Sequence, residues 1–167
     1  MDAGLTVFVN DAYVCNASFR DIYIEIWRKP GSVAQIRTTT KHQLAFAKSR
    51  SGSKIASLSI VNHGSVGGID NDMRKAIFEG QQQVRPYLSA GALVMPTSGF
   101  TASIVRGVVA GLALISRATH PTRVCQSIVE GTDWIAPHGG RGLTGAQVRH
   151  AVEELERAAP LPARHPG

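Results

Sequence analysis

The stretch 91–116, GALVMPTSGFTASIVRGVVAGLALIS, contains a complete strand–turn–helix unit. The run from Gly91 to Thr97 is short and apolar, as in a central strand, and the apolar sequence from Ser98 to about Ser116 predicts a helix. Short β-branched runs alternate with amphipathic helical stretches about four times along the chain. This alternation predicts an α/β layered domain with a mixed, mostly parallel sheet of about five strands and helices packed on it.

On the N-terminal side of this unit, the sequence predicts an opening hairpin and then a helix. Strand fragments at 6–9 and 13–15 precede a clearer strand at 21–27, in which isoleucines alternate with Tyr, Glu and Trp. Pro30-Gly31-Ser32 ends that strand and starts a helix. The predicted buried face of this helix consists of Val33, Ile36, Thr40, Leu44 and Ala47.

Further strands and helices are predicted on both sides of the central unit. Residues 54–62 form a central strand, and Asp70 or Asn71 caps a helix that Pro86 ends near Arg85. That helix has a predicted buried stripe of Ile69, Met73, Ile77, Val84 and Leu88. A fourth strand at 122–128 and a short helix at 130–136 complete the layered part.

The C-terminal residues divide into three predicted segments after a domain that covers 1–138. Residues 139–143 form a glycine-containing linker, 144–159 form a helix, and 160–167 form a disordered tail. Thr144 and Gln147 make a capping box at the start of the helix. The buried stripe predicted for this helix is Val148, Ala151, Val152 and Leu155.

The positive charge of the chain is concentrated in one stretch. The net charge is +6, and residues 28–54 hold seven basic residues with no Asp or Glu. Arg37, Lys41 and Lys48 line up along one flank of the first predicted helix and are candidates for binding an anionic surface. The alternative is a solvated helix face. There are no interleaved aromatic residues and no nucleic-acid-binding motif.

The loop after the strand at 54–62 is the candidate recognition site. Loops at the carboxyl edge of open α/β sheets are where ligands bind. This loop contains three glycines but no phosphate-binding motif, so a purely structural need for glycine is the alternative. The candidate residues for a protein partner are Asn62, His63, Gly64, Ser65 and Asp70.

The helix predicted from Ser98 is apolar almost all round, so it must be buried on more than one side. Gly107 and Gly111 are spaced to allow close approach of another element. Either the last helix covers this surface or a second subunit does, and the second case makes the protein a homo-oligomer. The candidate interface residues are Phe100, Ile104, Gly107, Val108, Gly111 and Leu112.

Several kinds of site and location are not indicated by the sequence. Cys15 and Cys125 each lie in or beside an apolar run, which favours two buried reduced thiols. No metal-binding spacing, catalytic triad or cofactor motif is present, so we expect no metal, no cofactor and no enzymatic activity. The start of the chain does not resemble a signal peptide, and the longest apolar stretch is too short to span a bilayer. We therefore expect a cytoplasmic location.

The order of predicted elements resembles that of STAS-like domains, the fold of bacterial anti-sigma factor antagonists and of the cytoplasmic module of sulphate transporters. The resemblance is one of architecture over roughly residues 5–137, and it rests on the strand at 55–62 with its loop and helix and on the unit 92–115. In the antagonists the corresponding loop carries a phosphorylatable Ser or Thr beside an Asp. Here the loop has Ser65 with Asp70 further on, and the Asp-Ser-Ser/Thr pattern is absent.

The resemblance implies a non-enzymatic regulatory or scaffolding module that binds another protein, including a second copy of itself. The alternative is a domain that binds a small ligand, a lipid or a nucleotide, at the carboxyl edge of the sheet. A small enzyme is the third hypothesis.

Overall fold

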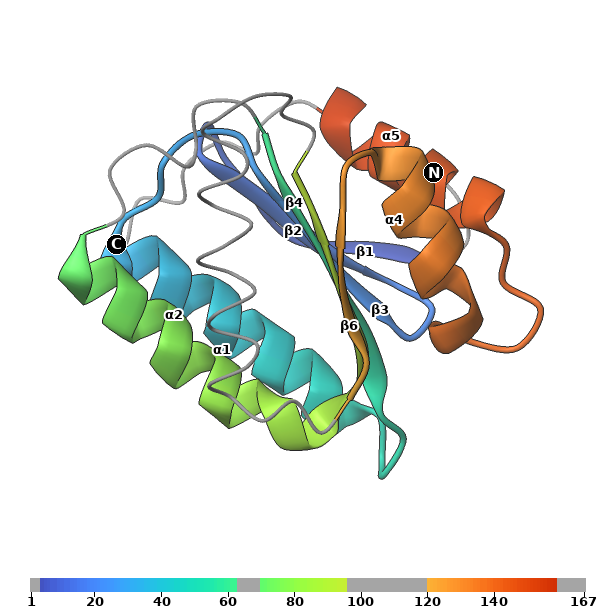
Figure 1. Cartoon of the computed structure of the whole chain (residues 1–167), viewed down its shortest axis with the longest axis horizontal. Helices are drawn as coiled ribbons and strands as arrows, with labels where there is room; N and C mark the ends of the chain where they lie inside the picture. Colours follow the sequence, from blue (N-terminus) through green and yellow to red (C-terminus); the bar gives the residue numbers. More distant parts are fainter. Residues whose placement is uncertain (1–3, 63–69, 96–119, 159–167) are drawn as a thin grey trace, which may run out of the picture.

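Six strands form one mixed sheet whose spatial order follows the chain, β1-β2-β3-β4-β5-β6 (Figure 1). The computed structural model describes residues 4–62, 70–95 and 120–158. β2 pairs antiparallel with both β1 and β3, and β3 to β6 are mutually parallel. The bounds of the strands are β1 Leu5–Asn10, β2 Val14–Phe19, β3 Ile22–Trp27, β4 Ile55–Val61, β5 Leu88–Val94 and β6 Thr122–Cys125.

The α/β class and the mixed sheet agree with the prediction, and the sheet has one strand more than the five expected. The bounds of β2 were poorly predicted, because the sequence showed only a fragment at 13–15. Asn16 and Ser18 interrupt the apolar pattern of this strand, yet both side chains are buried. When buried polar side chains break the pattern of apolar residues, the strand that carries them is hard to predict from the sequence.

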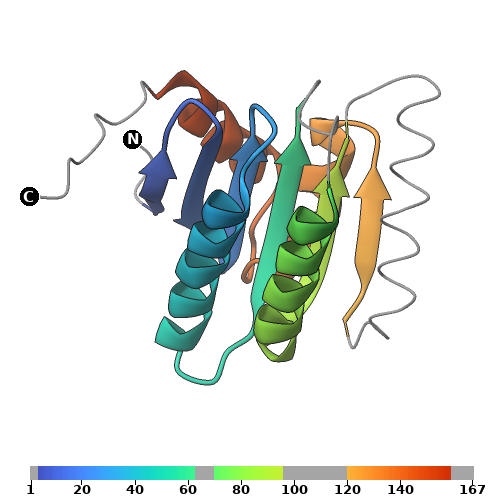
Figure 2. The same ribbon diagram turned by 90° about the vertical axis from the view of Figure 1, so that its left-hand side faces the viewer.

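Helices cover both faces of the sheet. The described helices are α1 Val33–Ser49, α2 Asn71–Val84, α4 Ile128–Ile135 and α5 Gly145–Arg157, with 3₁₀ turns η1 Arg85–Tyr87 and η2 Ala136–His138. Figure 1 shows α1 and α2 on one side and α4 and α5 on the other, and Figure 2 shows α1 and α2 running side by side along the sheet.

The core has a separate apolar cluster on each face of the sheet. The larger cluster lies under α4 and α5 and takes the alternate residues Ile22, Ile24 and Ile26 of β3. The predicted stripe of the last helix is confirmed, because Val148, Ala151, Val152 and Leu155 are all fully buried in it. The smaller cluster lies under α1 and α2 and consists of Tyr23, Phe46, Ala47, Ile55, Val84 and Leu88.

Most helix ends follow the local signals in the sequence. Asp70 caps α2, and α2 ends at Val84 before the turn that contains Pro86, as predicted. The predicted strand at 122–128 was too long, because the Ser127 side chain accepts a hydrogen bond of 3.1 Å from the Glu130 N–H and starts α4 at Ile128. The strand predicted from Gly91 begins three residues earlier, at Leu88, directly after η1.

The buried face predicted for the first helix was partly wrong. Ile36 and Ala47 are buried as expected, but Val33, Thr40 and Leu44 are only half-buried. The remaining buried positions of α1 are Thr39, Gln43 and Phe46. The helix is therefore rotated relative to the prediction, because polar side chains of the helix form hydrogen bonds with polar side chains of the sheet.

Candidate functional site

The predicted recognition loop begins and ends at two described residues. Asn62 follows β4 directly, and its N–H donates to the Trp27 carbonyl over 3.0 Å. The Asp70 side chain accepts a hydrogen bond of 2.8 Å from the Met73 N–H as the N-cap of α2. Capping therefore gives Asp70 a structural role, and recognition by this loop stays a prediction. Outside the described residues lie His63, Gly64 and Ser65.

The predicted interface helix lies in the part of the chain that the structure does not describe, residues 96–119. A subunit contact through this helix stays a prediction. The residues concerned are Phe100, Ile104, Gly107, Val108, Gly111 and Leu112.

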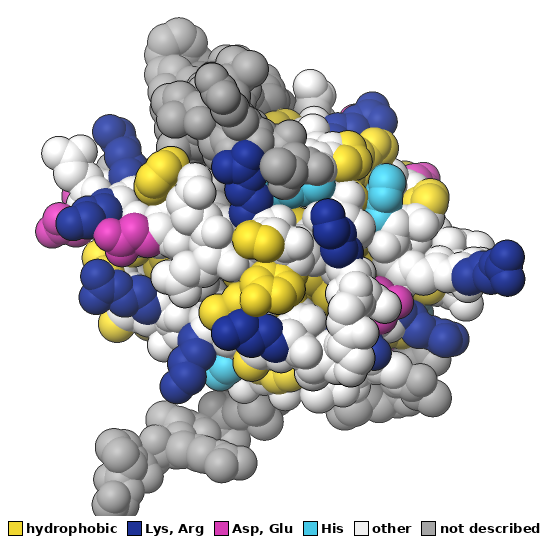
Figure 3. Space-filling model, turned by 90° about the horizontal axis from the view of Figure 1, so that it is seen from below, with side chains coloured by type: hydrophobic (Ala, Val, Ile, Leu, Met, Phe, Trp, Pro, Cys, Tyr) yellow, Lys and Arg dark blue, Asp and Glu magenta, His cyan; other side chains and the backbone are white. Residues whose placement is uncertain are grey.

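The outer face of α1 carries the three predicted anion-binding residues, Arg37, Lys41 and Lys48, which we call the basic flank. All three side chains are exposed, and α1 contains no Asp or Glu. Within residues 4–62, 70–95 and 120–158, none of the three pairs with a carboxylate. Figure 3 views the molecule from the side of α1 and α2, where Lys and Arg side chains surround an apolar patch. The structure thus brings the basic flank together on one surface.

A polar layer between α1 and the sheet sets the direction in which the basic flank points. The Gln43 side-chain amide donates to the Ser57 hydroxyl over 2.9 Å, and both residues are buried. The Tyr23 hydroxyl donates to the Thr39 carbonyl over 3.0 Å, and burial raises the pKa of Tyr23 far enough to keep it protonated. Removing the partner of a buried polar group destabilises the folded protein. These hydrogen bonds therefore fix the rotation of α1.

The same polar layer holds a carboxyl group on β3. The Ser59 hydroxyl donates to Glu25 over 2.6 Å. Burial raises the pKa of Glu25, and the hydrogen bonds from Ser59 and Trp27 offset part of that effect. The layer therefore contains a carboxyl group whose pKa is raised by its burial in the fold.

α2 extends the surface on which the basic flank lies. A Cβ on Gly80 would meet Thr40 at 3.2 Å from its Cγ2, so the two helices are in close contact at this level. Phe78, two residues before Gly80, is 37% exposed. At about 100° per residue, Phe78 projects from nearly the opposite face of α2 to Gly80, so its side chain points away from α1. Aromatic and arginine side chains are enriched in protein–protein interfaces.

Two other residues of the basic stretch 28–54 have internal roles. Arg28 donates to the Asn10 side chain over 2.7 Å and to the Leu155 carbonyl over 3.4 Å, which connects the opening hairpin to the C-terminal end of α5. Arg50 Nε lies 3.3 Å from Asp21 Oδ1, and its guanidinium lies over the Phe46 ring. The sequence could not separate these structural cations from the three of the basic flank.

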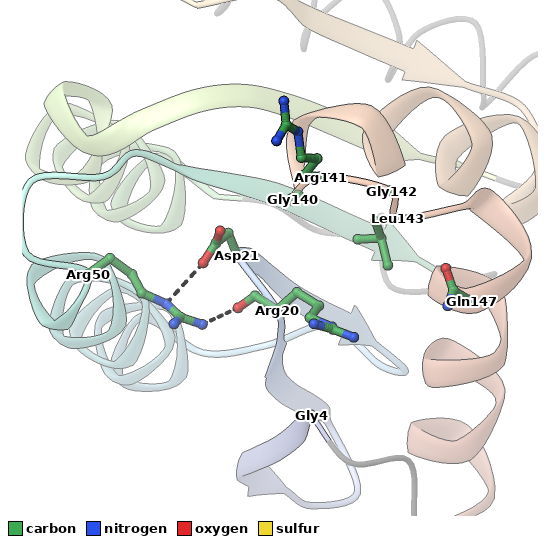
Figure 4. A pocket seen from close by; sticks show the side chains of 10 residues that line it. Gly4, Arg20, Asp21, Arg50, Gly140, Arg141, Gly142, Leu143 and Gln147 are labelled. Carbon is green, nitrogen blue, oxygen red and sulfur yellow. Dashed lines mark hydrogen bonds and ion pairs between the residues drawn. The ribbon is translucent and has the colours of Figure 1, made fainter.

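A cavity of about 420 Å³ lies at the edge of the sheet where β3 begins. Its charged lining residues are Arg20, Asp21, Arg50 and Arg141, and we call it the arginine cavity. Figure 4 shows Arg50 and Asp21 on one side of it and Gln147 on the other, with the Arg20 side chain extended between them.

The arginine cavity was not predicted from the sequence. Its residues come from the β2–β3 turn, the end of α1 and the stretch 139–143, which lie far apart in the chain. The available signal was the run Gly139-Gly-Arg-Gly142, which was interpreted only as a linker.

Within the described residues, no group of three His, Cys, Asp or Glu side chains is placed to hold a metal ion. In the same residues, no helix has both the length and the apolar character needed to cross a membrane. Cys15 and Cys125 are buried free thiols, as predicted, and burial raises the pKa of Cys15 to about 11.

Comparison with models of known protein families, with curated proteins and with solved structures gave no match.

Proposed function

We propose that the protein is a regulatory or scaffolding module that acts by binding another protein, and that the basic flank on α1 is the centre of the binding surface. The observation that carries this proposal is that Arg37, Lys41 and Lys48 are exposed on one helix that has no acidic residue. Their charges form no ion pair with a carboxylate within the described residues, so they are available to pair with the carboxylates of a binding protein.

The chemistry of the surface favours an acidic protein as the partner. Ala34, Thr38 and Ala45 are exposed small residues on the same helix, and they leave room for a partner's backbone or helix to approach. A surface that combines small residues with cations suits a folded protein better than the stacked bases of a single-stranded nucleic acid, which need several aromatic platforms.

The mode of action follows from the rigidity of the surface. The hydrogen bonds from Gln43 and Tyr23 hold α1 against the sheet, so the basic flank is presented in a fixed arrangement before binding. A pre-organised surface loses less conformational entropy on association. The charges raise the association rate and make it sensitive to salt.

The test is capture of interacting proteins from the native host with immobilised wild-type protein, followed by measurement of the identified complex with purified components. The variant replaces Arg37, Lys41 and Lys48 by Glu. The matched control makes the same change in net charge at three exposed basic residues outside α1, Lys29, Lys54 and Arg157, none of which pairs with a carboxylate within the described residues.

We expect the flank variant to lose at least about 100-fold in affinity for the purified partner, because charge reversal replaces attraction by repulsion at three positions. The control should lose much less, and salt should weaken the wild-type complex. Equal losses in both variants would show that only net charge matters. Binding of wild-type protein to acidic vesicles or nucleic acid, with no protein partner, would also refute the proposal.

A further inference from the structure

β1 is an edge strand of the sheet (Figure 2). Within the described residues it pairs with β2 alone, and a bulge between Val7 and Val9 interrupts that pairing. The strand carries no charged residue and no proline, and Val7, Phe8 and Val9 are only half-buried. Proteins usually cover or block such an edge, because its unpaired backbone groups can otherwise pair with another chain.

The register of the two hairpins shows which backbone groups of β1 face the free edge. Phe19 closes the two-residue turn that leads to β3, so it directs its N–H and its carbonyl toward β3. These directions alternate along a strand, so the neighbouring Ser18 faces β1, where its partner is Thr6. The N–H groups of Leu5 and Val7, on either side of Thr6, therefore point away from β2.

The side chains of Leu5 and Val7 lie on the α5 side of the sheet. Both are half-buried and pack against the larger apolar cluster. Residues directly opposite each other in an antiparallel pair place their side chains on the same face. A strand that completes this edge therefore needs an apolar side chain at a position whose own N–H points toward β1.

The chain leaves α5 beside the end of β1. The Asn10 side-chain amide donates to the Ala158 carbonyl over 3.2 Å, and Ala158 has an extended backbone with φ of −61° and ψ of 127°. Residues 160–167, for which the sequence predicts a disordered tail, lie outside the described residues. When extended, residues 159–167 span up to about 30 Å, whereas β1 is roughly 20 Å long, so this segment can reach along the whole strand.

The sequence of this segment has prolines at alternating positions. Pro160, Pro162 and Pro166 all have even numbers. Because successive N–H groups of an extended chain point in opposite directions, the missing donors fall on one side, and the odd positions keep their N–H groups for the other side. Leu161, the largest apolar side chain of the segment, has an odd number. Each proline also restricts the residue before it to extended conformations.

We propose that residues 159–167 bind to the free edge of β1 as an additional antiparallel strand, with the prolines on the outer side. The odd positions then pair with Leu5 and Val7, and Leu161 extends the larger apolar cluster. The outer side has few N–H donors, which blocks the addition of a further chain. Because the segment starts at the end of β1, its effective concentration favours it over a second copy of the protein. The interaction uses no residue of the basic flank.

The test is amide hydrogen exchange of the full chain, measured by NMR at a concentration where sedimentation shows a monomer. The N–H groups of Leu5 and Val7 report on the free edge. The N–H of Thr6, which faces β2, is the internal reference.

Three variants separate the segment from other causes of protection. A chain that ends at Ala158 lacks the segment. Ala163→Pro removes a donor on the inner side, and the matched control Arg164→Pro places a proline on the outer side. Melting temperatures establish that the variants are folded. Both proline variants keep the full chain, so their comparison decides the matter even if the shortened chain is less stable.

We expect the Leu5 and Val7 N–H groups to exchange at least about tenfold more slowly in the wild type than in the shortened chain, with Thr6 unchanged. Ala163→Pro should exchange like the shortened chain, and Arg164→Pro like the wild type. Equal exchange in the wild type and the shortened chain would overturn the proposal, and so would equal effects of the two proline substitutions. Protection that appears only at concentrations where a dimer forms would overturn it in favour of a second copy.

Discussion

Replacing Leu155 by Ala tests whether α5 is part of the core or an appended helix. Its side chain is fully buried, and its carbonyl accepts a hydrogen bond from Arg28. If α5 belongs to the core, removing this side chain destabilises the whole domain. If α5 is a helix tethered by residues 139–143, the same change loosens only the helix.

The magnitude follows from the buried atoms. The substitution removes three carbon atoms from a position with no solvent exposure. At about 0.8 kcal/mol per buried methylene, the lost transfer free energy is about 2.4 kcal/mol, and the cavity left behind brings the loss to about 3 kcal/mol. For a domain of this size that corresponds to a fall of about 10 °C in Tm.

The assay is urea unfolding followed by circular dichroism and by tryptophan fluorescence. Trp134 on α4 packs against the larger cluster, and Trp27 ends β3. Both signals should move together to lower urea. The exposed neighbour Glu156→Ala is the control and should change the free energy of unfolding by less than about 0.5 kcal/mol. A loss below about 1 kcal/mol for Leu155→Ala, or a separate early transition for α5, would refute the assignment of α5 to the core.

Two further predictions concern Glu25 and Gly139. Burial raises the pKa of Glu25 above its ordinary value of 4.5, so its contribution to stability is complete below that value and is lost as the pH rises through the native pKa. Glu25→Gln should therefore melt higher than the wild type at neutral pH, and this difference should vanish in acid. Melting curves from about pH 4 to pH 8 check this, and a pH-independent difference would contradict it. Gly139→Ala places a methyl group against Ile22, which is fully buried, and should cost about 1–2 kcal/mol of stability. Ile22→Ala, which removes both the Cγ1 and the Cδ1 that the new methyl group would meet, should recover part of that cost in a double-mutant cycle measured by urea unfolding, whereas simple additivity would argue against the contact.

Sequence patterns predicted the elements whose signals are local or strongly periodic. The stripe of α5 was correct because its four apolar residues recur at helical spacing on one face. The end of α2 was correct because Pro86 cannot continue a helix. The exposure of the basic flank also agrees with its helical spacing. These features depend on neighbours within a few residues.

The misjudged features depend on contacts between distant parts of the chain. The burial of Thr39 and Gln43 results from partners on the sheet, such as Ser57, that no helical period reveals. The same polar layer concealed the length of β2. The arginine cavity joins residues 20 and 141, which only the fold brings together. Pairing of buried polar groups and convergence of loops are properties of three-dimensional packing, so a single sequence does not display them.

The order of the strands has a consequence for how the protein emerges during synthesis. Because strands are neighbours in the sheet in the order in which they are translated, each new strand can join one that already exists. The exception is the covering of β2 by α5: the Cys15 thiol lies 3.9 Å from the Leu155 carbonyl, across a separation of 140 residues. At roughly 5–20 residues per second, synthesis of these 140 residues takes about 7–28 s, and this apolar face of the growing sheet stays uncovered for that time. During that interval, the nascent chain presents a surface on which chaperones act and from which aggregation starts.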